Sequence, residues 1–428
     1  MSLVKRGKHG VSTHKVDKAY QGYTLFCPLL TRWKQMEGND TSKVYLMDMN
    51  GNFVHYWEVP GLIKMHADLL PNGHILCSVD IKERHPENFI NVGFNCTTVM
   101  ELDWDSNVVW EYNNMNHDYH DRCRLRNGNT IVNIVKEIDP ELQKKIKGGL
   151  PGSEVGGNNP AWSHKAGERP TDLDEGKIYT LVLTEITPDN EVVWEMDLSQ
   201  ALDPELDVIT PLTGRSLWPG LNSIDELPDG NLISTSYNLS QVYIWDRETK
   251  KVKWRFGQGK DKISFPHDPH GLENGNVILF DNGRFHSADP DGGTNFFPPD
   301  FSRVIEINPE TNEIVWEYRA ETPVDFYSTY ISSCERLPNG NTFICEGATG
   351  RFFEVTPNKE ICWEYLSPFY TNSGVRQGKT NSVFRAMRIP LNHPGLQGKK
   401  FNFDDPKLQQ LNQLYGAEAM YWANKLNS

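Results

Sequence analysis

The sequence predicts an all-β fold, a six-bladed β-propeller with a short C-terminal helix, because two repeated phrases alternate along the chain. The first phrase is an alternating strand, a turn rich in Asn, Asp or Gly, and a second strand that closes on tryptophan. It occurs at residues 44–57, 99–110, 182–194, 242–254, 304–316 and 352–363. A single hairpin cannot bury its own apolar face, whereas hairpins stacked around an axis can.

The second phrase ends one strand on leucine, turns through Asn-Gly or Asp-Gly, and begins the next strand. It occurs at residues 69–76, 125–132, 227–234, 272–279 and 337–344. The turn glycine supplies the positive φ that a tight hairpin turn needs. Residues 385–394 form a sixth copy that lacks the glycine, as expected where a ring closes on itself. Two hairpins per unit predict four strands per blade, and the alternative, unrelated hairpins in a β-sandwich, does not explain the doubled repeat.

Three regions follow from the repeats: an N-terminal arm at 1–21, the propeller at 22–400 and a C-terminal helix at 401–428. Residues 22–30 are expected to form a strand that completes the last blade. Strands from both termini would then close the ring and leave no exposed edge. The terminal helix is expected to begin after an Asp-rich segment and to pack on the propeller or on a partner subunit.

Two long segments interrupt the repeats. Residues 147–177 are rich in Gly, Pro and Asn, and we predict a loop that packs over one end of the propeller. Residues 285–302 form a second long loop. The first loop offers Trp162, His164 and Lys165 to a bound ligand.

The composition restricts the partners. The net charge of −14 argues against nucleic acid and against an anionic membrane surface. No run of 18 apolar residues is present. Seven scattered cysteines without a C-x-x-C pair predict reduced thiols in the cytoplasm, with removal of a signal peptide as the alternative. We therefore expect a cytoplasmic protein with a small-molecule substrate, and a homo-oligomer through the termini remains open.

Polar residues recur at two positions ahead of the turn glycines, where the innermost strands of a propeller converge. Eight residues before the glycine stand Met65, His120, Asn222, His267 and Ser332, and seven before it stand His66, Asp121, Ser223, Asp268 and Ser333. Equivalent positions on successive blades should converge on one axis. The alternative is that the Asp and Ser side chains cap blade hydrogen bonds.

The densest polar segment is residues 265–286, which carries His267, His270, Asn282 and Arg284. Imidazole can act as nucleophile, general acid or base, or metal ligand. A guanidinium matches the oxygens of sulfate or carboxylate, although an ion pair with a neighbouring Asp is the alternative. We predict that the catalytic residues are His267, Arg284 and His120. The predicted substrate-binding residues are His66, His117, Asn222, Ser223, His270, Asn282, Trp218 and Tyr330.

The order of the motifs GYTLFCPL, VYLMDMNG, LLPNG, LNSIDELPDGN and FPHD…FDNGR resembles the arylsulfate sulfotransferase (arylsulfotransferase-like) propeller family over residues 22–363. The resemblance implies a six-bladed propeller that moves a sulfuryl group from a phenolic sulfate to another phenol without a nucleotide donor. It also implies a histidine that carries the group covalently. By motif, His267 matches the histidine of the family's His-Asp pair, and Arg284 matches the arginine after FDNG. No cofactor is then required.

Two motifs depart from the family. Residues 220–223 read GLNS where the family has a histidine, and residues 327–336 contain no histidine to carry a sulfuryl group. The departures keep a second reading open, a lyase, hydratase or hydrolase that uses the histidines for acid–base work or for a divalent metal. A non-catalytic propeller that binds protein partners is the third alternative, but such a scaffold does not need a channel end rich in His and Arg.

Overall fold

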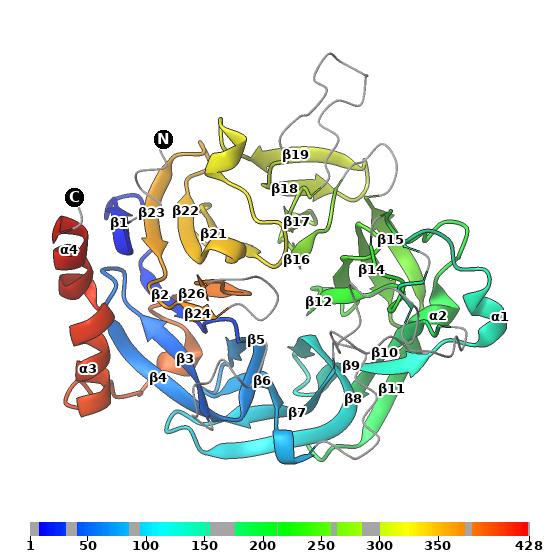
Figure 1. Cartoon of the computed structure of the whole chain (residues 1–428), viewed down its shortest axis with the longest axis horizontal. Helices are drawn as coiled ribbons and strands as arrows, with labels where there is room; N and C mark the ends of the chain where they lie inside the picture. Colours follow the sequence, from blue (N-terminus) through cyan, green and yellow to red (C-terminus); the bar gives the residue numbers. More distant parts are fainter. Residues whose placement is uncertain are drawn as a thin grey trace.

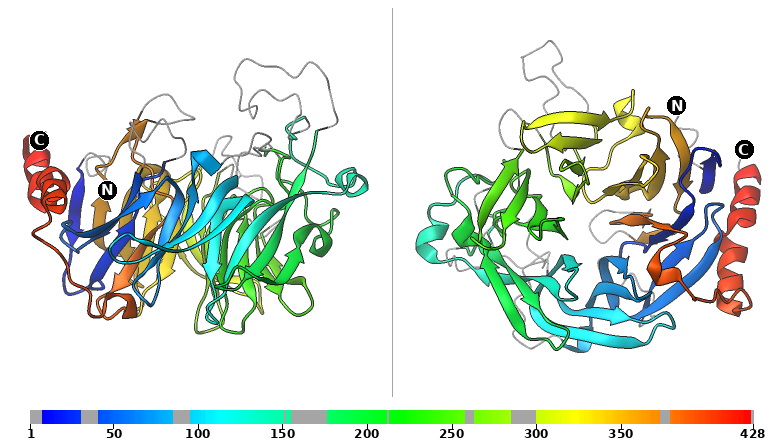
Figure 2. Two further views of the ribbon diagram at one scale, coloured as in Figure 1. Left: turned by 90° about the horizontal axis from the view of Figure 1, so that it is seen from below. Right: turned by 180° about the vertical axis from the view of Figure 1, so that it is seen from behind.

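The computed structural model describes residues 8–30, 41–84, 95–150, 152–154, 176–211, 213–257, 263–284, 300–372 and 379–426. Its strands stand around a central axis in a β-propeller-like ring (Figure 1). Helices α3 (Pro406–Tyr415) and α4 (Ala417–Leu426) lie at one edge of the ring beside strand β1, and the side view in Figure 2 shows the strands standing next to one another. The expected C-terminal helix is confirmed as these two short helices, which Gly416 separates.

Four blades are separate antiparallel sheets of four or five strands. One contains β12 (Leu221–Glu226), β13 (Leu232–Ser236), β14 (Gln241–Asp246) and β15 (Lys251–Phe256). The next contains β16 (His267–Gly271), β17 (Val277–Asp281), β18 (Arg303–Asn308) and β19 (Glu313–Tyr318). The third contains β20 (Ser333–Arg336), β21 (Thr342–Glu346), β22 (Arg351–Val355), β23 (Ile361–Leu366) and β1 (Gly10–His14). The fourth contains β26 (Ala386–Pro390), β2 (Gly22–Phe26), β3 (Thr41–Met47) and β4 (Phe53–Pro60).

The remaining two repeats form one seven-stranded sheet. It consists of β5 (Leu62–Leu69), β6 (Ile75–Asp80), β7 (Asn95–Leu102), β8 (Val108–Arg124), β9 (Thr130–Glu137), β10 (Tyr179–Ile186) and β11 (Val192–Asp197). Strand β8 is 17 residues long, pairs with β7 along its first part and with β9 along its second, and contains no Gly or Pro that would end it. The prediction of six separate blades is therefore wrong, because four blades are separate and this sheet is continuous.

Both ends of the propeller close the ring as predicted. Strand β2 pairs with β26 on one side and with β3 on the other, so an N-terminal strand completes the blade that begins at the C-terminal end. Strand β1 adds a fifth strand to the outer edge of β23. The short helices α1 (Pro140–Gln143) and α2 (Leu198–Ala201) and the pair β24 (Thr371–Asn372) and β25 (Lys379–Thr380) lie outside the main sheets.

The tryptophan that ends each first-phrase repeat bonds to the next repeat around the ring. The indole N–H donors and their acceptors are Trp57 to the Asp103 carbonyl (3.1 Å), Trp110 to Pro188 (2.9 Å), Trp194 to Arg247 (3.0 Å), Trp254 to Asn312 Oδ1 (2.9 Å), Trp316 to Pro357 (3.3 Å) and Trp363 to Met49 (2.8 Å). The last bond joins the final repeat to the first. The periodic tryptophans are thus contacts between repeats as well as strand ends.

Replacing Trp363 with phenylalanine is expected to lower the free energy of unfolding by about 1–3 kcal/mol. The indole is fully buried, and its loss leaves the Met49 carbonyl without its donor at the closing contact of the ring. Urea unfolding of the variant measures the change. Trp316→Phe is the control, because its bond is longer and exposed, and it should lose less stability than Trp363→Phe.

All seven cysteines are free and buried. No helix in the described ranges is long and apolar enough to cross a membrane. Most of the two predicted long loops, with Trp162, His164 and Lys165, lies outside the described residues.

Candidate active site

The polar positions recognised in the sequence coincide with irregularities in the innermost strands. Pairing shifts between Lys64 and Ala67 in β5, between His267 and His270 in β16, and between Leu221 and Ser223 in β12. Met65 and Asp268 have positive φ values of 64° and 53°. A bulge redirects side chains that a regular strand would alternate between faces. The bulges therefore redirect these polar side chains from the regular alternation of a strand.

His267 is buried, and its tautomer is fixed by Asn282. The Asn282 amide nitrogen donates to the carbonyls of Ser328 (2.8 Å) and Ile331 (2.7 Å), which identifies the other amide atom as oxygen. That oxygen lies 2.7 Å from His267 Nδ1. Nδ1 must therefore carry the proton and donate it, and in the neutral ring Nε2 keeps its lone pair.

The imidazole of His267 is neutral over the ordinary pH range. Burial lowers its pKa to about 4, more than its bonds to Asn282 and to the Phe265 carbonyl raise it, and nearby His120 lowers it further. Among the described residues Nε2 has no hydrogen-bond partner. The rings of Tyr237 and Phe384 stand edge-to-face to it, with centroids 5.9 and 6.0 Å away. The site thus presents a nitrogen lone pair beside aromatic side chains.

Arg284 supplies a positive charge to the aromatic side chains around this histidine. Its Nη1 donates to the hydroxyl of Tyr237 at 2.9 Å, and its guanidinium lies 5.6 Å from the centre of the Phe265 ring. The Tyr237 ring packs against Phe265 at 4.5 Å and also faces His267. Tyr237 therefore contacts both the guanidinium and the imidazole.

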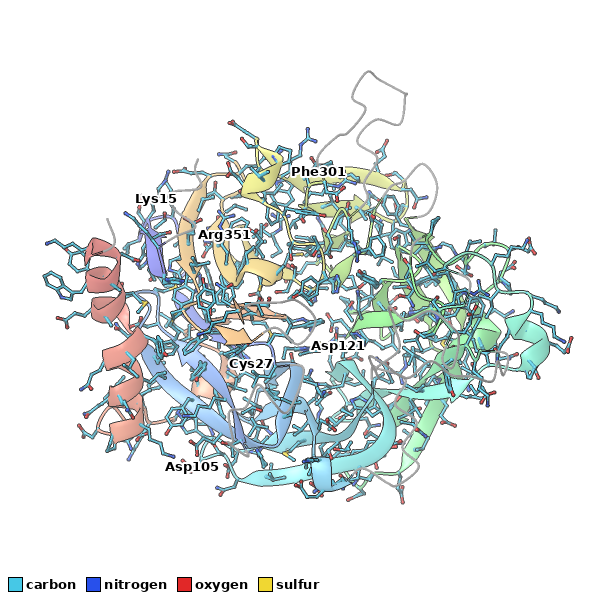
Figure 3. The ribbon with its side chains drawn as sticks, in the orientation of Figure 1. Lys15, Cys27, Asp105, Asp121, Phe301 and Arg351 are labelled. Carbon is cyan, nitrogen blue, oxygen red and sulfur yellow. The ribbon has the colours of Figure 1, made fainter. Side chains whose placement is uncertain are left out.

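Residues next to these positions form a buried ionic network, and we call it the channel network. Its centre is Arg385, which contacts Asp121 (3.0 Å), Asp268 (2.9 Å) and His66 Nε2 (3.1 Å) from three different strands. Figure 3 shows Asp121 near the middle of the ring. Burial alone would raise the pKa of Asp268, but Arg385 and His270 hold it below its ordinary value. Both carboxylates are consequently ionised and paired.

His66 belongs to the channel network. Arg122 and Arg385 both approach its Nε2, at 3.0 and 3.1 Å, and burial together with these two cations lowers its pKa. The Asp121 carboxylate also lies 3.2 Å from this nitrogen. The face of the ring stacks on Phe384 at 5.5 Å, so His66 supports the aromatic wall that also borders His267.

His270 is a cation between two carboxylates. Its Nδ1 lies 2.9 Å from Asp225 and its Nε2 lies 3.2 Å from Asp268. Although burial opposes the charge, these carboxylates raise its pKa well above the ordinary value. Both nitrogens are occupied, and the ring borders a cavity of about 200 Å³ beyond Asp268.

Three further predicted residues position the segment around His267. Asn222 donates to the Pro266 carbonyl at 2.8 Å, directly before His267. Ser223 bonds the hydroxyl of Thr235 in the neighbouring strand. The hydroxyl of Tyr330 is 3.3 Å from that of Ser382, and its ring packs with the cluster that contains Phe384.

Two predicted substrate-binding residues are fully buried. His117 lies in β8, where its Nε2 is 3.0 Å from the Ser78 hydroxyl. The indole N–H of Trp218 donates to the Asp207 carbonyl at 2.7 Å. Their role in substrate binding stays a prediction.

The sequence reading missed Tyr237, Phe384 and Arg385. Tyr237 stands at the same distance after its turn glycine, Gly230, as Asn282 does after Gly275, so comparing positions after the turns would have found it. Arg385 begins the sixth copy and Phe384 directly precedes it, and the missing glycine of this copy removed the reference point for counting.

A metal site is not evident in the part of the chain that the structure describes. There, no group of three or more His, Cys, Asp or Glu side chains is arranged to hold an ion. The nitrogens of His66 and His270 are already engaged by arginines and carboxylates.

Replacing Asn282 with leucine is expected to release the tautomer of His267 and to slow turnover by about 10-fold or more, because a fraction of the rings would then carry the proton on Nε2. Nitrogen-15 NMR of the imidazole should show a protonated Nδ1 in the wild type and a mixture in the variant. A loss of activity without a change in these spectra would contradict the positioning role.

Comparison with protein families identifies the central part of the chain. Residues 170–367, which include His267, Asn282 and Arg284, match the model of the family described as arylsulfotransferase (ASST). This part of the chain is arylsulfotransferase-like. The resemblance seen in the sequence is confirmed, and the match supports an enzyme of the sulfotransferase type. No curated protein matches the chain.

The solved structures that are similar to this chain are distant. A protein of unknown function from Bacteroides caccae aligns with a TM-score of 0.49 and 11% identity, over 86% of this chain and 99% of that one. A streptogramin B lyase aligns at 0.42 and 14% identity, over 86% of each chain. Hydrazine synthase from Kuenenia stuttgartiensis aligns at 0.41 and 11% identity, over 74% of this chain and 71% of that one.

Proposed function

We propose that this chain transfers a sulfuryl group from a phenyl sulfate to a second phenol, with His267 Nε2 as the nucleophile. Nε2 attacks the sulfur, an N–S bond forms and the bond from sulfur to the phenolic oxygen breaks. An acceptor phenol then attacks the sulfur, and the N–S bond breaks. Arg284 binds the sulfate oxygens in both steps, and His120 lies near enough to His267 to influence its charge.

The observation that carries the proposal is the fixed, neutral imidazole. Its Nδ1–H is held by Asn282, its Nε2 lone pair is unengaged among the described residues, and a guanidinium lies one side chain away. A lowered pKa keeps the nucleophile unprotonated without a separate base. Aromatic rings of Tyr237 and Phe384 suit a phenyl group. No cofactor is needed for this transfer, and we place the reaction in the cytoplasm with small phenolic substrates.

A lyase, hydratase or hydrolase is the second candidate, with the same Nε2 as general base. The feature that favours it is the segment before β20, where the family's carrier histidine is missing. The hydroxyl of Ser332 is committed to Ser328 and to the Gly347 N–H, and burial and a bond to Asp300 raise the pKa of Tyr327. A divalent metal is possible under this reading.

The deciding experiment incubates the protein with 4-nitrophenyl sulfate and a phenol acceptor, with and without chelator. Transfer to the acceptor that survives chelation supports sulfuryl transfer. Release of nitrophenol without acceptor sulfation, or a complete lack of reaction together with bound metal, supports the second candidate.

Replacing Arg284 with alanine is expected to lower kcat/KM for the phenyl sulfate by about 10²–10³-fold, the usual loss when a group that stabilises anionic oxygens is removed. Arg319→Ala is the control, because the Arg319 side chain is exposed and pairs with Glu317 at the surface. Equal rates for Arg284→Ala and wild type would show that the guanidinium does not bind the sulfate.

A further inference from the structure

We propose that Tyr237 is a catalytic residue that passes a proton to the departing phenolic oxygen and takes it back from the acceptor phenol. This inference rests on the proposed sulfuryl transfer. The need for such a group is chemical: a phenolate is a poor leaving group unless its oxygen is protonated as the bond to sulfur breaks. His267 cannot supply this proton, because Nδ1–H is held by Asn282 and Nε2 is the attacking atom.

The geometry points to Tyr237. It follows β13 in the turn to β14, and its half-buried ring crosses to the neighbouring blade to meet Phe265 and His267. Its hydroxyl oxygen accepts a hydrogen bond from Arg284 at 2.9 Å. Because the oxygen accepts from a permanent cation, the hydroxyl is polarised to give up its proton, and the resulting phenolate oxygen would be paired with the guanidinium.

The other tyrosines near the site are placed for different tasks. The hydroxyl of Tyr327 donates to the Asp300 carboxylate at 2.7 Å, and burial and this bond raise its pKa, so Tyr327 retains its proton. The hydroxyl of Tyr330 is 3.3 Å from that of Ser382. Tyr237 differs from Tyr327 because its hydroxyl oxygen accepts from a cation, whereas that of Tyr327 donates to a carboxylate.

The proton balance closes over one cycle. As Nε2 of His267 bonds to sulfur and the sulfur–oxygen bond breaks, the Tyr237 proton moves to the leaving oxygen, and a neutral phenol departs. The Tyr237 oxygen, now anionic, is stabilised by Arg284. When the acceptor phenol attacks sulfur, its proton moves to the Tyr237 oxygen, and Nε2 recovers its lone pair.

Tyr237→Phe tests the assignment, because it removes only the hydroxyl and keeps the ring that packs on Phe265 and His267. With a series of phenyl sulfates, the variant should lose about 10²-fold in kcat/KM for unsubstituted phenyl sulfate and much less for 4-nitrophenyl sulfate, whose leaving group needs no proton. The slope of rate against leaving-group pKa should steepen. An unchanged slope would overturn the proposal.

Tyr365→Phe is the matched control. The Tyr365 hydroxyl is buried and has no hydrogen-bond partner among the described residues, so its removal should change neither the slope nor the folding. A steeper slope in Tyr365→Phe as well would overturn the assignment, because the effect would then not be specific to Tyr237.

Binding of 4-nitrophenol separates this inference from the proposed reaction. Its affinity, measured by the change in absorbance on binding, should fall about tenfold in Tyr237→Phe, the loss expected for one hydrogen bond. If wild type transfers no sulfuryl group but nitrophenol binding depends on Tyr237, the reaction is wrong and Tyr237 still binds the phenolic oxygen. Equal nitrophenol binding by both proteins overturns the inference whatever the transfer assay shows.

Discussion

His267→Gln is expected to lose at least about 10²-fold in kcat, because glutamine fills a similar volume but has neither a nucleophilic nitrogen nor a base. The imidazole is the one group in the described site with a fixed, uncommitted lone pair. Steady-state rates with the phenyl sulfate donor measure the loss, and near-UV circular dichroism checks that the variant is folded. Full activity in this variant would exclude His267 under every reading of the reaction.

The pH dependence of the wild type provides a second test of His267. Since the active form is the neutral ring, kcat/KM should stay constant down to about pH 4, the lowered pKa of His267, instead of falling near 6.5. A histidine that is stabilised by a carboxylate contributes more to the free energy of unfolding as the pH falls, whereas His267 contributes less. Between pH 6.5 and 4 the unfolded chain binds a proton that the folded ring does not, so the contribution of His267 to the free energy of unfolding decreases as the pH falls.

A control for the histidine substitution is His74→Gln. His74 lies in the turn before β6 and bonds Glu101 at 2.7 Å, away from the innermost-strand bulges. It should retain wild-type kcat and the same pH profile. A comparable loss in His74→Gln would point to a general effect of removing histidine and not to chemistry at His267.

Arg385→Ala is expected to lower the free energy of unfolding by about 3–5 kcal/mol, the usual cost of removing one partner from a buried ionic group. The variant leaves Asp121 and Asp268 buried with one fewer cation between them. Arg385→Lys should recover only part of the stability, since an ammonium cannot reach three partners as the guanidinium does. Urea unfolding of the full chain measures both variants.

The matched comparison for Arg385 is again Arg319→Ala, whose exposed side chain should contribute little to stability. If Arg385→Ala unfolds at the same urea concentration as wild type, the channel network does not hold the blades together. Because Arg385 immediately follows Phe384, its loss should also loosen the aromatic wall beside His267, and kcat should fall together with stability.

The number of separate blades could not be predicted from the repeats. The six tryptophans correctly marked six units, and their indoles join consecutive units around the ring. Whether two neighbouring units form one sheet depends on the pairing of the strand between them, and β8 pairs with both β7 and β9. Hydrogen bonding between strands, and not the repeat itself, decided this point.

The candidate site, like the fold, could be predicted from the sequence only in part. Counting back from the turn glycines selected His267 and His66, which lie eight and seven residues before their glycines. The motif FDNGR added Asn282 and Arg284. Counting along the sequence could not distinguish His267, whose Nε2 has no partner among the described residues, from His66, because both are buried histidines in equivalent strands. The distinction comes from their partners, an amide oxygen in one case and two guanidinium groups in the other.

The strand-and-turn repeat, the closure of the ring by both termini and the register of the polar residues could be predicted from the sequence, because side-chain alternation and turn glycines are local properties. Which of these residues can react depends on contacts between distant parts of the chain. Tyr237 lies on a neighbouring blade and Arg385 enters with the closing strand, so their contacts with the His267–Asp268 segment join positions remote in sequence. Burial and nearby charge then set the protonation of each histidine, and these depend on all the elements packed around it.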